Sequence, residues 1–556
     1  MAATASPQFG GVWTHRRRHD WQPPAELKMM KGHIMGPYLP DAVRHHAAER
    51  PEAPAVSEGE LTLTYADLHS RSNRIAQALL AEGLKTGSHV GYLVRPGLMS
   101  AELLVACAKS GLVATPLNWR LGDPELTDVA LDAELEAVIT QEEFLPRARA
   151  IRDAYRVLPL ISGGEPVGGE RTYESWLGAM PDRDPGLGTK GCGDTVFLQL
   201  YTSGTTGLPK GVQLTLRNLD MGEYFQREVG WSERCVSLNA MPGFHIAGKG
   251  WLVQALVAGA HTIMMPNLTP EGAVDVMEKE RVTHALFVPA VLHMLTTVED
   301  VGERDFSALQ LISYGGSPIA PAALLRSMEI FGCDFCQRYG QTETAASVTR
   351  LLPADHDPDG SRAHLLHSAG NAWPDVEVAV ADPVTGQFKP PGAVGEIYTR
   401  SHHLTPGYWK RPDENNRLFT KDGWLKTGDA GYLDEEGYLF ITDRIKDMVI
   451  TGGENVYPIE VESVLAEHPA VSEVAVFGTP DEKWGEVVTA AVVLKAGASD
   501  ITSDELIDFT RQRIASYKKP RIVHFVDELP RNPSGKILKR VLRDSVGRGA
   551  RPISRC

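Results

Sequence analysis

The feature that most constrains the fold of this chain is an alternation of short apolar runs with helix-like stretches over most of its length. Four runs rich in β-forming residues each precede a turn or a helix, at residues 103–117, 194–204, 283–295 and 309–318. Strands that alternate with helices are joined by crossovers, which place them in parallel sheets covered by helices. We therefore predict an α/β fold with parallel sheets.

The pattern changes from about Gly370, where apolar and polar residues alternate between Pro-Val-Thr-Gly and Pro-Pro-Gly turns. That pattern is typical of antiparallel strands and predicts a small β-barrel. A different α+β unit follows, with helices at 459–467 and 503–516 and strands at 471–477, 487–494 and 521–525. Because 556 residues are too many for one core, we predict an extension (1–40), a large domain (41–443), a small mobile domain (444–545) and a tail (546–556).

Composition and charge exclude several classes of protein. A formal net charge of −15 does not suggest a surface for nucleic acid, so we expect no such partner. No apolar run reaches the ~20 residues of a membrane span, and the first residues lack the apolar core of a secretory signal, so we expect a cytoplasmic protein. Six cysteines are too few for a disulfide framework. Cys333 and Cys336 are interpreted as buried strand residues, and a homodimer is compatible with the sequence.

A glycine-rich stretch, LYTSGTTGLPKG at residues 200–211, follows one of the predicted strands. Its glycines, hydroxyl groups and Lys210 are suited to holding phosphate. It does not fit the Walker template, because Pro209 precedes the lysine and Gly211 follows it. Taken alone, an ordinary turn explains the stretch equally well. Its place after a strand favours a ligand site, since parallel sheets bind ligands at the carboxyl ends of strands.

Further motifs follow this stretch in a fixed order: MPGFH (241–245), SYGGSP (313–318), RYGQTE (338–343), a long motif at 424–462 and PRNPSGKI (530–537). The series covers roughly residues 41–543 and resembles the adenylate-forming superfamily, most closely its acyl-CoA synthetases. The resemblance implies an AMP-forming acyl-CoA ligase. Such an enzyme joins a carboxylic acid to the α-phosphate of ATP, releases pyrophosphate and passes the acyl group to a thiol. ATP, Mg²⁺ and the co-substrate CoA are the implied ligands.

The same resemblance implies a nucleotide site in the large domain. Tyr339 would lie against adenine, Asp429 would bind both ribose hydroxyls, and Glu343 would bind Mg²⁺ as a hard oxygen ligand. Outside this series, Glu343 would be interpreted as a solvated turn residue and Asp429 as a turn cap. The other implied contacts are Thr202 (also a metal ligand), Ser203, Gly204, Thr205, Thr206, Gly207, Lys210, Gly315, Gly316, Ser317, Gly340, Thr342 and Arg444.

The small domain is implied to carry residues for both half-reactions. Lys536 resembles the catalytic lysine of the adenylation step, and Lys446 matches the hinge about which the domain would rotate. The chain departs from the commoner Gly-Arg of the superfamily by having Asp443 before Arg444. The residues that resemble CoA-nucleotide contacts also fit a basic, solvated helix end: Trp484, Tyr517, Lys519 and Arg521.

The acid is implied to enter beside His245, which is included among the catalytic residues. Ala247, Gly248 and Gly250 are small, which suggests space, and Trp251 is interpreted as the floor of the pocket. A medium- or long-chain fatty acid or a bulky aryl or alicyclic acid fits, and the sequence does not choose among them. Two alternatives stay open: transfer to a carrier-protein thiol or another acceptor, and a non-catalytic nucleotide-binding protein.

Overall fold

The computed structural model describes residues 36–155, 160–162, 171–187, 192–202, 209–220, 227–444, 447–451, 454–481, 483–495, 497–498, 501–531 and 537–547. Several predicted site residues, and the side chain of Arg444, lie outside this description: Ser203, Gly204, Thr205, Thr206, Gly207, Lys446 and Lys536.

The first sheet has eight strands in the order β19-β9-β8-β4-β3-β5-β6-β7. Its strands β3 to β8 pair in parallel, whereas β9 and β19 add an antiparallel edge. β3 and β4 are buried along their whole length, as expected for parallel strands covered on both faces. The bounds are β3 (His89–Leu93), β4 (Val113–Pro116), β5 (Leu135–Thr140), β6 (Leu160–Ser162), β7 (Arg171–Thr172), β8 (Val196–Thr202), β9 (Lys210–Thr215) and β19 (Gly407–Tyr408).

The second sheet has nine strands in the order β16-β15-β14-β13-β12-β10-β11-β1-β2. The six strands from β14 to β1 in this order pair in parallel, which confirms the α/β prediction. The bounds are β1 (Pro54–Glu58), β2 (Leu61–Thr64), β10 (Val236–Asn239), β11 (His261–Met264), β12 (His284–Phe287), β13 (Leu311–Gly315), β14 (Asp334–Tyr339), β15 (Thr349–Leu351) and β16 (Asn371–Ala372).

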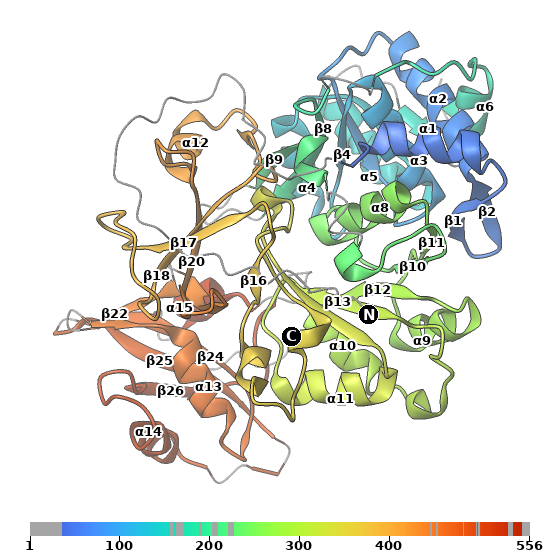
Figure 1. The fold of residues 1–556 in the computed structure, drawn as a ribbon. Helices are drawn as coiled ribbons and strands as arrows, with labels where there is room; N and C mark the ends of the chain where they lie inside the picture. The colour runs from blue at the N-terminus through green and yellow to red at the C-terminus, as the bar shows by residue number, and fades with distance from the viewer. Residues whose placement is uncertain are drawn as a thin grey trace, which may run out of the picture.

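Helices cover both sheets, and α3 and α8 lie between them (Figure 1). α3 is buried from Ser100 to Ser110, and a helix that is buried on all sides lacks the period that marks an amphipathic one. For this reason the prediction of a β-rich run at 103–117 was wrong in its first half. The bounds are α1 (Leu39–Glu49), α2 (Tyr65–Ala81), α3 (Leu98–Ser110), α4 (Asp123–Asp132), α5 (Leu145–Tyr155), α6 (Tyr173–Gly178), α8 (Ile246–Ala258), α9 (Pro270–Lys279), α10 (Pro289–Leu295), α11 (Pro321–Phe331) and α12 (Pro412–Leu418).

The cysteine prediction is half correct. Cys336 is buried in β14, whereas Cys333 lies in the turn between α11 and that strand and is only partly buried. Burial raises the pKa of both thiols to about 12. Both therefore remain protonated at neutral pH, which does not suit a metal ligand or a redox nucleophile.

The antiparallel strands after Gly370 form a four-stranded sheet in the order β17-β18-β20-β21. Within the described residues β17 and β21 are its edges, so the pairing is that of an open sheet rather than the predicted barrel. Its bounds are β17 (Glu377–Ala381), β18 (Gly395–Arg400), β20 (Leu425–Leu433) and β21 (Leu439–Arg444).

The C-terminal part of the chain has its own sheet, in the order β23-β22-β25-β24, with β26 also paired to β25. Its two hydrophobic clusters draw only on residues after 448. None of the described helices is long and apolar enough to cross a membrane. The bounds are β22 (Val449–Thr451), β23 (Glu454–Val456), α13 (Pro458–Ala466), β24 (Val471–Asp481), β25 (Gly485–Leu494), α14 (Ser503–Arg511), β26 (Ile522–Phe525) and α15 (Lys539–Gly547).

Candidate active site

The glycine-rich stretch includes the end of β8 and the start of β9, two strands that form a β-hairpin. β8 and β9 pair antiparallel, and their register places Thr202 directly opposite Lys210. Next to Thr202 in β8, the Tyr201 hydroxyl donates a 2.8 Å hydrogen bond to the carboxylate of Asp132. Lys210 forms an ion pair with Glu414, the third residue of α12. The hairpin and its lysine are therefore held by side chains from distant parts of the sequence.

The RYGQTE motif presents Glu343 on a strained loop after β14. Ala345 and Ala346 both have positive φ, at 48° and 59°, a backbone region that alanine rarely adopts. A Cβ on Gly340 would lie 2.4 Å from the backbone of Ala346, so glycine is required there. The Glu343 carbonyl accepts a 2.8 Å bond from the Thr405 amide. These constraints fix the direction in which the Glu343 side chain leaves the loop.

Tyr408 joins Glu343 to the hairpin. Its hydroxyl donates a 2.9 Å hydrogen bond to Glu343 Oε1, and its ring centre lies 5.2 Å from Lys210 Nζ. Tyr408 reaches this position because β19 pairs with β9, opposite Val212. Burial, followed by the Glu343 carboxylate, raises the pKa of Tyr408 well above its ordinary range, so this phenol stays a hydrogen-bond donor at any working pH.

Asp429, in β20, is buried against the same motif. Its Oδ2 accepts hydrogen bonds from the Tyr339 hydroxyl at 2.8 Å and from Gln341 Nε2 at 2.7 Å. The Gln341 amide also donates to the Thr427 carbonyl at 2.8 Å. The two residues predicted to contact adenine and ribose thus lie side by side, and Gln341 orients the carboxylate.

A continuous set of contacts therefore runs from the hairpin to β20, through Lys210, Tyr408, Glu343 and the 339–341 segment to Asp429. Sequence reasoning missed Tyr408, Glu414 and Gln341. Gln341 lies inside a motif that the sequence singles out. Nothing in the sequence ties Tyr408 or Glu414 to the site, because their contacts depend on the pairing of β19 with β9.

The SYGGSP stretch spans the end of β13. A Cβ on Gly315 would lie 2.2 Å from the carbonyl oxygen of Arg338 on the neighbouring β14, so the packing of the two strands requires glycine here. Its contact with the nucleotide stays a prediction. Gly316 has a φ of +84°, which explains its identity, and both Gly316 and Ser317 are exposed at the end of β13. Thr342 is partly buried in the short 3₁₀ turn Thr342–Thr344.

His245 precedes α8 and contacts aromatic residues. Its ring centre lies 4.6 Å from that of Phe244, which in turn lies 5.7 Å from Trp119. Burial, followed by the charge of Arg120, lowers the pKa of His245 to about 4. The imidazole is therefore neutral at pH 7 and meets a carboxylate as a hydrogen-bonding group without positive charge.

The prediction that the small residues of α8 leave space for the acid is wrong at Gly248. A Cβ on Gly248 would lie 2.5 Å from the Pro242 carbonyl oxygen, so Gly248 permits close packing and creates no space. Trp251 is 2% exposed, and its indole N–H donates a 3.1 Å bond to the Leu238 carbonyl, which places it in the core. Ala247 is partly exposed and Gly250 is buried.

In the small domain, two of the four residues predicted to contact CoA touch each other. The guanidinium carbon of Arg521 lies 4.5 Å from the ring centre of Trp484. Tyr517 is 42% exposed and Lys519 is partly buried. The neighbouring Lys518 is held by Glu460 at 2.8 Å.

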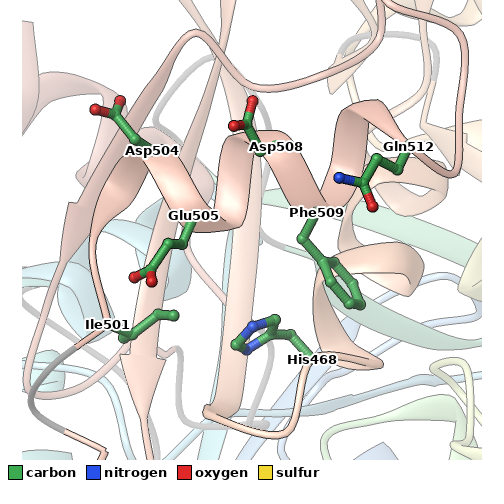
Figure 2. A pocket seen from close by; sticks show the side chains of 7 residues that line it. All are labelled: His468, Ile501, Asp504, Glu505, Asp508, Phe509 and Gln512. Atoms are coloured by element: carbon green, nitrogen blue, oxygen red, sulfur yellow. The ribbon is translucent and has the colours of Figure 1, made fainter.

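A surface hollow on the small domain lies away from these residues, between α14 and His468, which follows α13 (Figure 2). Three carboxylates line it, from Asp504, Glu505 and Asp508, and none of the predicted site residues does. Figure 2 shows these acidic side chains along one helix. Because carboxylates repel phosphate, this hollow does not suit a nucleotide.

Comparison with known proteins assigns the family. The chain matches the AMP-binding enzyme family over residues 43–409 and the AMP-binding enzyme C-terminal domain over residues 460–536. The protein belongs to this adenylate-forming superfamily and is similar to its acyl-CoA synthetases.

Relatives and solved structures agree with this assignment. A fatty acid–[acyl-carrier-protein] ligase, ScoC from Streptomyces coeruleorubidus, is 42% identical over 515 residues, which cover 92% of this chain and 96% of the relative. An indoleacetate–CoA ligase from Aromatoleum aromaticum is 36% identical over 525 residues, 92% of this chain and 98% of the relative. The crystal structure of ATP-bound MatB from Rhodopseudomonas palustris superposes with a TM-score of 0.83 at 30% identity, covering 92% and 99% of the two chains.

Proposed function

We propose that the protein is an AMP-forming acyl-CoA ligase, which activates a carboxylic acid as its acyl adenylate and transfers the acyl group to the thiol of CoA. The observation that supports this best is the set of contacts from Lys210 through Tyr408 and Glu343 to Asp429. These contacts bring together an ammonium group and two carboxylates, which in this proposal meet the phosphates, the metal ion and the ribose of ATP in that order.

In this proposal the hairpin holds the β- and γ-phosphates that leave as pyrophosphate. Thr202 and Lys210 face each other where β8 ends and β9 begins, so a hydroxyl and an ammonium can both contact the same phosphate chain. Asp429 binds the ribose, and Tyr339 presents its ring to adenine while its hydroxyl holds Asp429. Positioning and charge stabilisation are the protein's main contributions to such a transfer.

The residues present fit a magnesium ion. A carboxylate has about four acceptor positions, and Tyr408 takes one of those on Glu343, so coordination capacity remains. Glu343 and the Thr202 hydroxyl supply the oxygen ligands that this ion prefers. When bound, Mg²⁺ neutralises charge on the phosphates. Tyr408 fixes the Glu343 rotamer, and the strained 340–346 loop fixes its backbone.

The small domain supplies the remaining groups. Lys536 would stabilise the charge that develops between the carboxylate and the α-phosphate. Rotation about Lys446 would then replace it with the surface that admits the thiol. The Trp484–Arg521 pair supports CoA as the acceptor, because a stacked indole and guanidinium suit a nucleotide base and its phosphates.

A second acceptor class is favoured by a specific finding. The relative with 42% identity is named a fatty acid–[acyl-carrier-protein] ligase, so a carrier-protein phosphopantetheine thiol is the alternative to CoA. The two acceptors are separated by measuring AMP release with acid and ATP after adding either CoA or a phosphopantetheinylated carrier protein. Turnover only with the carrier protein would overturn the CoA assignment and leave the adenylation step intact.

We further propose that the acid is apolar, either a medium- or long-chain fatty acid or a bulky aryl or alicyclic acid. The support is the aromatic surround of His245, formed by Phe244 and Trp119, together with the neutral state of its imidazole. A panel of carboxylic acids scored for AMP formation with ATP and CoA tests both the class and the activity.

The substitution that tests the mechanism is Lys536→Ala. Adenylate formation should fall by several powers of ten, since a well-placed cation is worth a few kcal/mol and each ~1.4 kcal/mol is tenfold in rate. ATP binding and thioester formation from prepared acyl adenylate should be nearly unchanged. Lys279→Ala, at a lysine whose side chain is 79% exposed on α9, is the matched control. Equal damage to both half-reactions would contradict the assignment.

A further inference from the structure

A bulge in β20 carries Asp429, the residue that the proposed function assigns to the ribose. β18 and β20 pair antiparallel (Figure 1), and between two regular pairs the three residues 427–429 of β20 lie opposite the single residue Ile397. Bulges bend a strand and redirect its side chains, and they are common beside active sites. The bulge therefore sets the direction in which Asp429 leaves the sheet.

Side chains form hydrogen bonds with the backbone of this bulge. The Gly428 amide donates a 3.2 Å hydrogen bond to Glu396 Oε1. The Asp429 amide donates at 3.1 Å to the Thr427 hydroxyl, which itself donates to the Ile397 carbonyl at 2.8 Å. Because backbone N–H groups inside a protein need acceptors, these bonds favour one geometry of the bulge.

The bond from Gly428 lies at the sharpest point of the bulge. Gly428 has a φ of +70°, in the left-handed region, and no atom lies within 4 Å of where its Cβ would be. The backbone conformation, rather than crowding, therefore requires glycine. Glu396 reaches this position from β18, so it holds the turn immediately before Asp429.

The position of Glu396 is unfavourable for a carboxyl group. Burial raises the pKa of this carboxyl and nearby Asp429 raises it further, whereas the Gly428 amide and Lys426 lower it. A partly buried carboxylate beside a second carboxylate costs folding stability. Perturbed carboxyl groups of this kind are concentrated at functional sites, which favours a role for Glu396 in ligand binding.

We propose that Glu396 is a positioning residue for ribose recognition, which holds the bulge of β20 through the Gly428 amide so that the Asp429 carboxylate meets the ribose hydroxyls. This inference rests on the proposed function, in which Asp429 binds the ribose of ATP. Tyr339 and Gln341 bond to Asp429 Oδ2. The side chain of Asp429 is thus held by the RYGQTE motif and its backbone by the bulge.

The test measures the Kd of ATP and of 2′-deoxy-ATP for the full-length protein by titration calorimetry with Mg²⁺ present. The ratio of the two Kd values reports how well a carboxylate is placed against the 2′-hydroxyl. Wild-type protein should favour ATP at least about tenfold, the worth of a hydrogen bond to a charged group. Glu396→Ala should lose most of this ratio. Glu396→Gln, whose side-chain carbonyl also accepts from Gly428, should keep most of it.

Two controls separate positioning from folding. Glu377→Ala removes a carboxylate of the adjacent β17 that pairs with Arg400 at 2.8 Å, and it should leave the ratio unchanged. The Tm of each variant reports whether the fold is kept. If Glu396→Ala does not fold, Glu396→Leu takes its place, because leucine fills similar space and offers no acceptor, and it must lose the ratio as well.

Three results would overturn the inference. If wild-type protein favours ATP and the alanine variant favours it equally, Glu396 does not position Asp429, and the proposed function stands. If the alanine and glutamine variants lose the ratio equally, the bond to the Gly428 amide is not what matters. If wild-type protein binds both nucleotides equally, Asp429 does not bind the ribose, and that part of the proposed function fails together with this inference.

Discussion

Tyr408→Phe tests whether the contact between β19 and the RYGQTE loop sets the metal requirement of adenylation. The substitution removes only the hydroxyl that donates to Glu343 Oε1 at 2.9 Å. A hydrogen bond to a charged group is worth about 1.5–3 kcal/mol. The side chains of Tyr408 and Glu343 are only partly buried, so the lower end of this energy range applies. We therefore expect about a tenfold rise in the Mg²⁺ concentration for half-maximal rate, since ~1.4 kcal/mol is a factor of ten.

The assay is pyrophosphate release from acid and ATP in the absence of CoA, measured across Mg²⁺ concentrations at fixed ATP. Glu343→Gln alone should lower the rate severely and flatten the Mg²⁺ dependence. If Tyr408 acts only through Glu343, the double variant should be no worse than Glu343→Gln. Tyr432→Phe, at a tyrosine stacked on Phe440 with ring centres 5.0 Å apart, is the control for loss of a phenol hydroxyl.

Two outcomes would refute this reasoning. In the first, Tyr408→Phe lowers the rate but leaves the Mg²⁺ dependence unchanged, which would mean that Tyr408 acts through the hairpin and Lys210 rather than through Glu343. In the second, the losses in the double variant are additive, which would mean that the two residues act independently.

Three further predictions follow from the contacts. Glu414→Gln releases Lys210 from its partly buried ion pair and should lower the KM for ATP by up to about fivefold, the equivalent of a pair worth up to ~1 kcal/mol; an unchanged KM would show that the pair does not compete with phosphate. Trp484→Ala and Arg521→Ala should each raise the KM for CoA several-fold and leave that for ATP alone, and the double variant should be little worse than either single one. Lys249 is 1% exposed, and burial lowers its pKa to about 7. Between pH 7 and the pKa of this lysine in the unfolded chain, the unfolded chain binds more protons than the folded chain. The free energy of unfolding therefore rises with pH in this range. Lys249→Met should therefore remove about 2 kcal/mol of the gain in unfolding free energy between pH 7 and 9 seen in denaturant titrations, and an unaltered pH slope would contradict the burial argument.

The sequence determined the parts of this protein that depend on local pattern and chemistry. Alternating apolar runs predicted the parallel sheets, since a strand buried on both faces must be apolar along its length. The motif series predicted that Tyr339, Glu343 and Asp429 would share one site, and the first and last of these lie in hydrogen-bonding contact. The helix α3 was missed in part, because a helix buried on every side lacks the period that identifies one.

Only the tertiary structure decided which distant residues complete the site. Tyr408 reaches Glu343 because β19 pairs with β9, and Glu396 reaches the bulge that carries Asp429 because β18 pairs with β20. At Gly315 and Gly248, neighbouring backbones pass within 2.5 Å of where a Cβ would be, so packing requires glycine at both positions. Such contacts join residues far apart in sequence. No local pattern encodes them, since they arise when packing brings separate segments together.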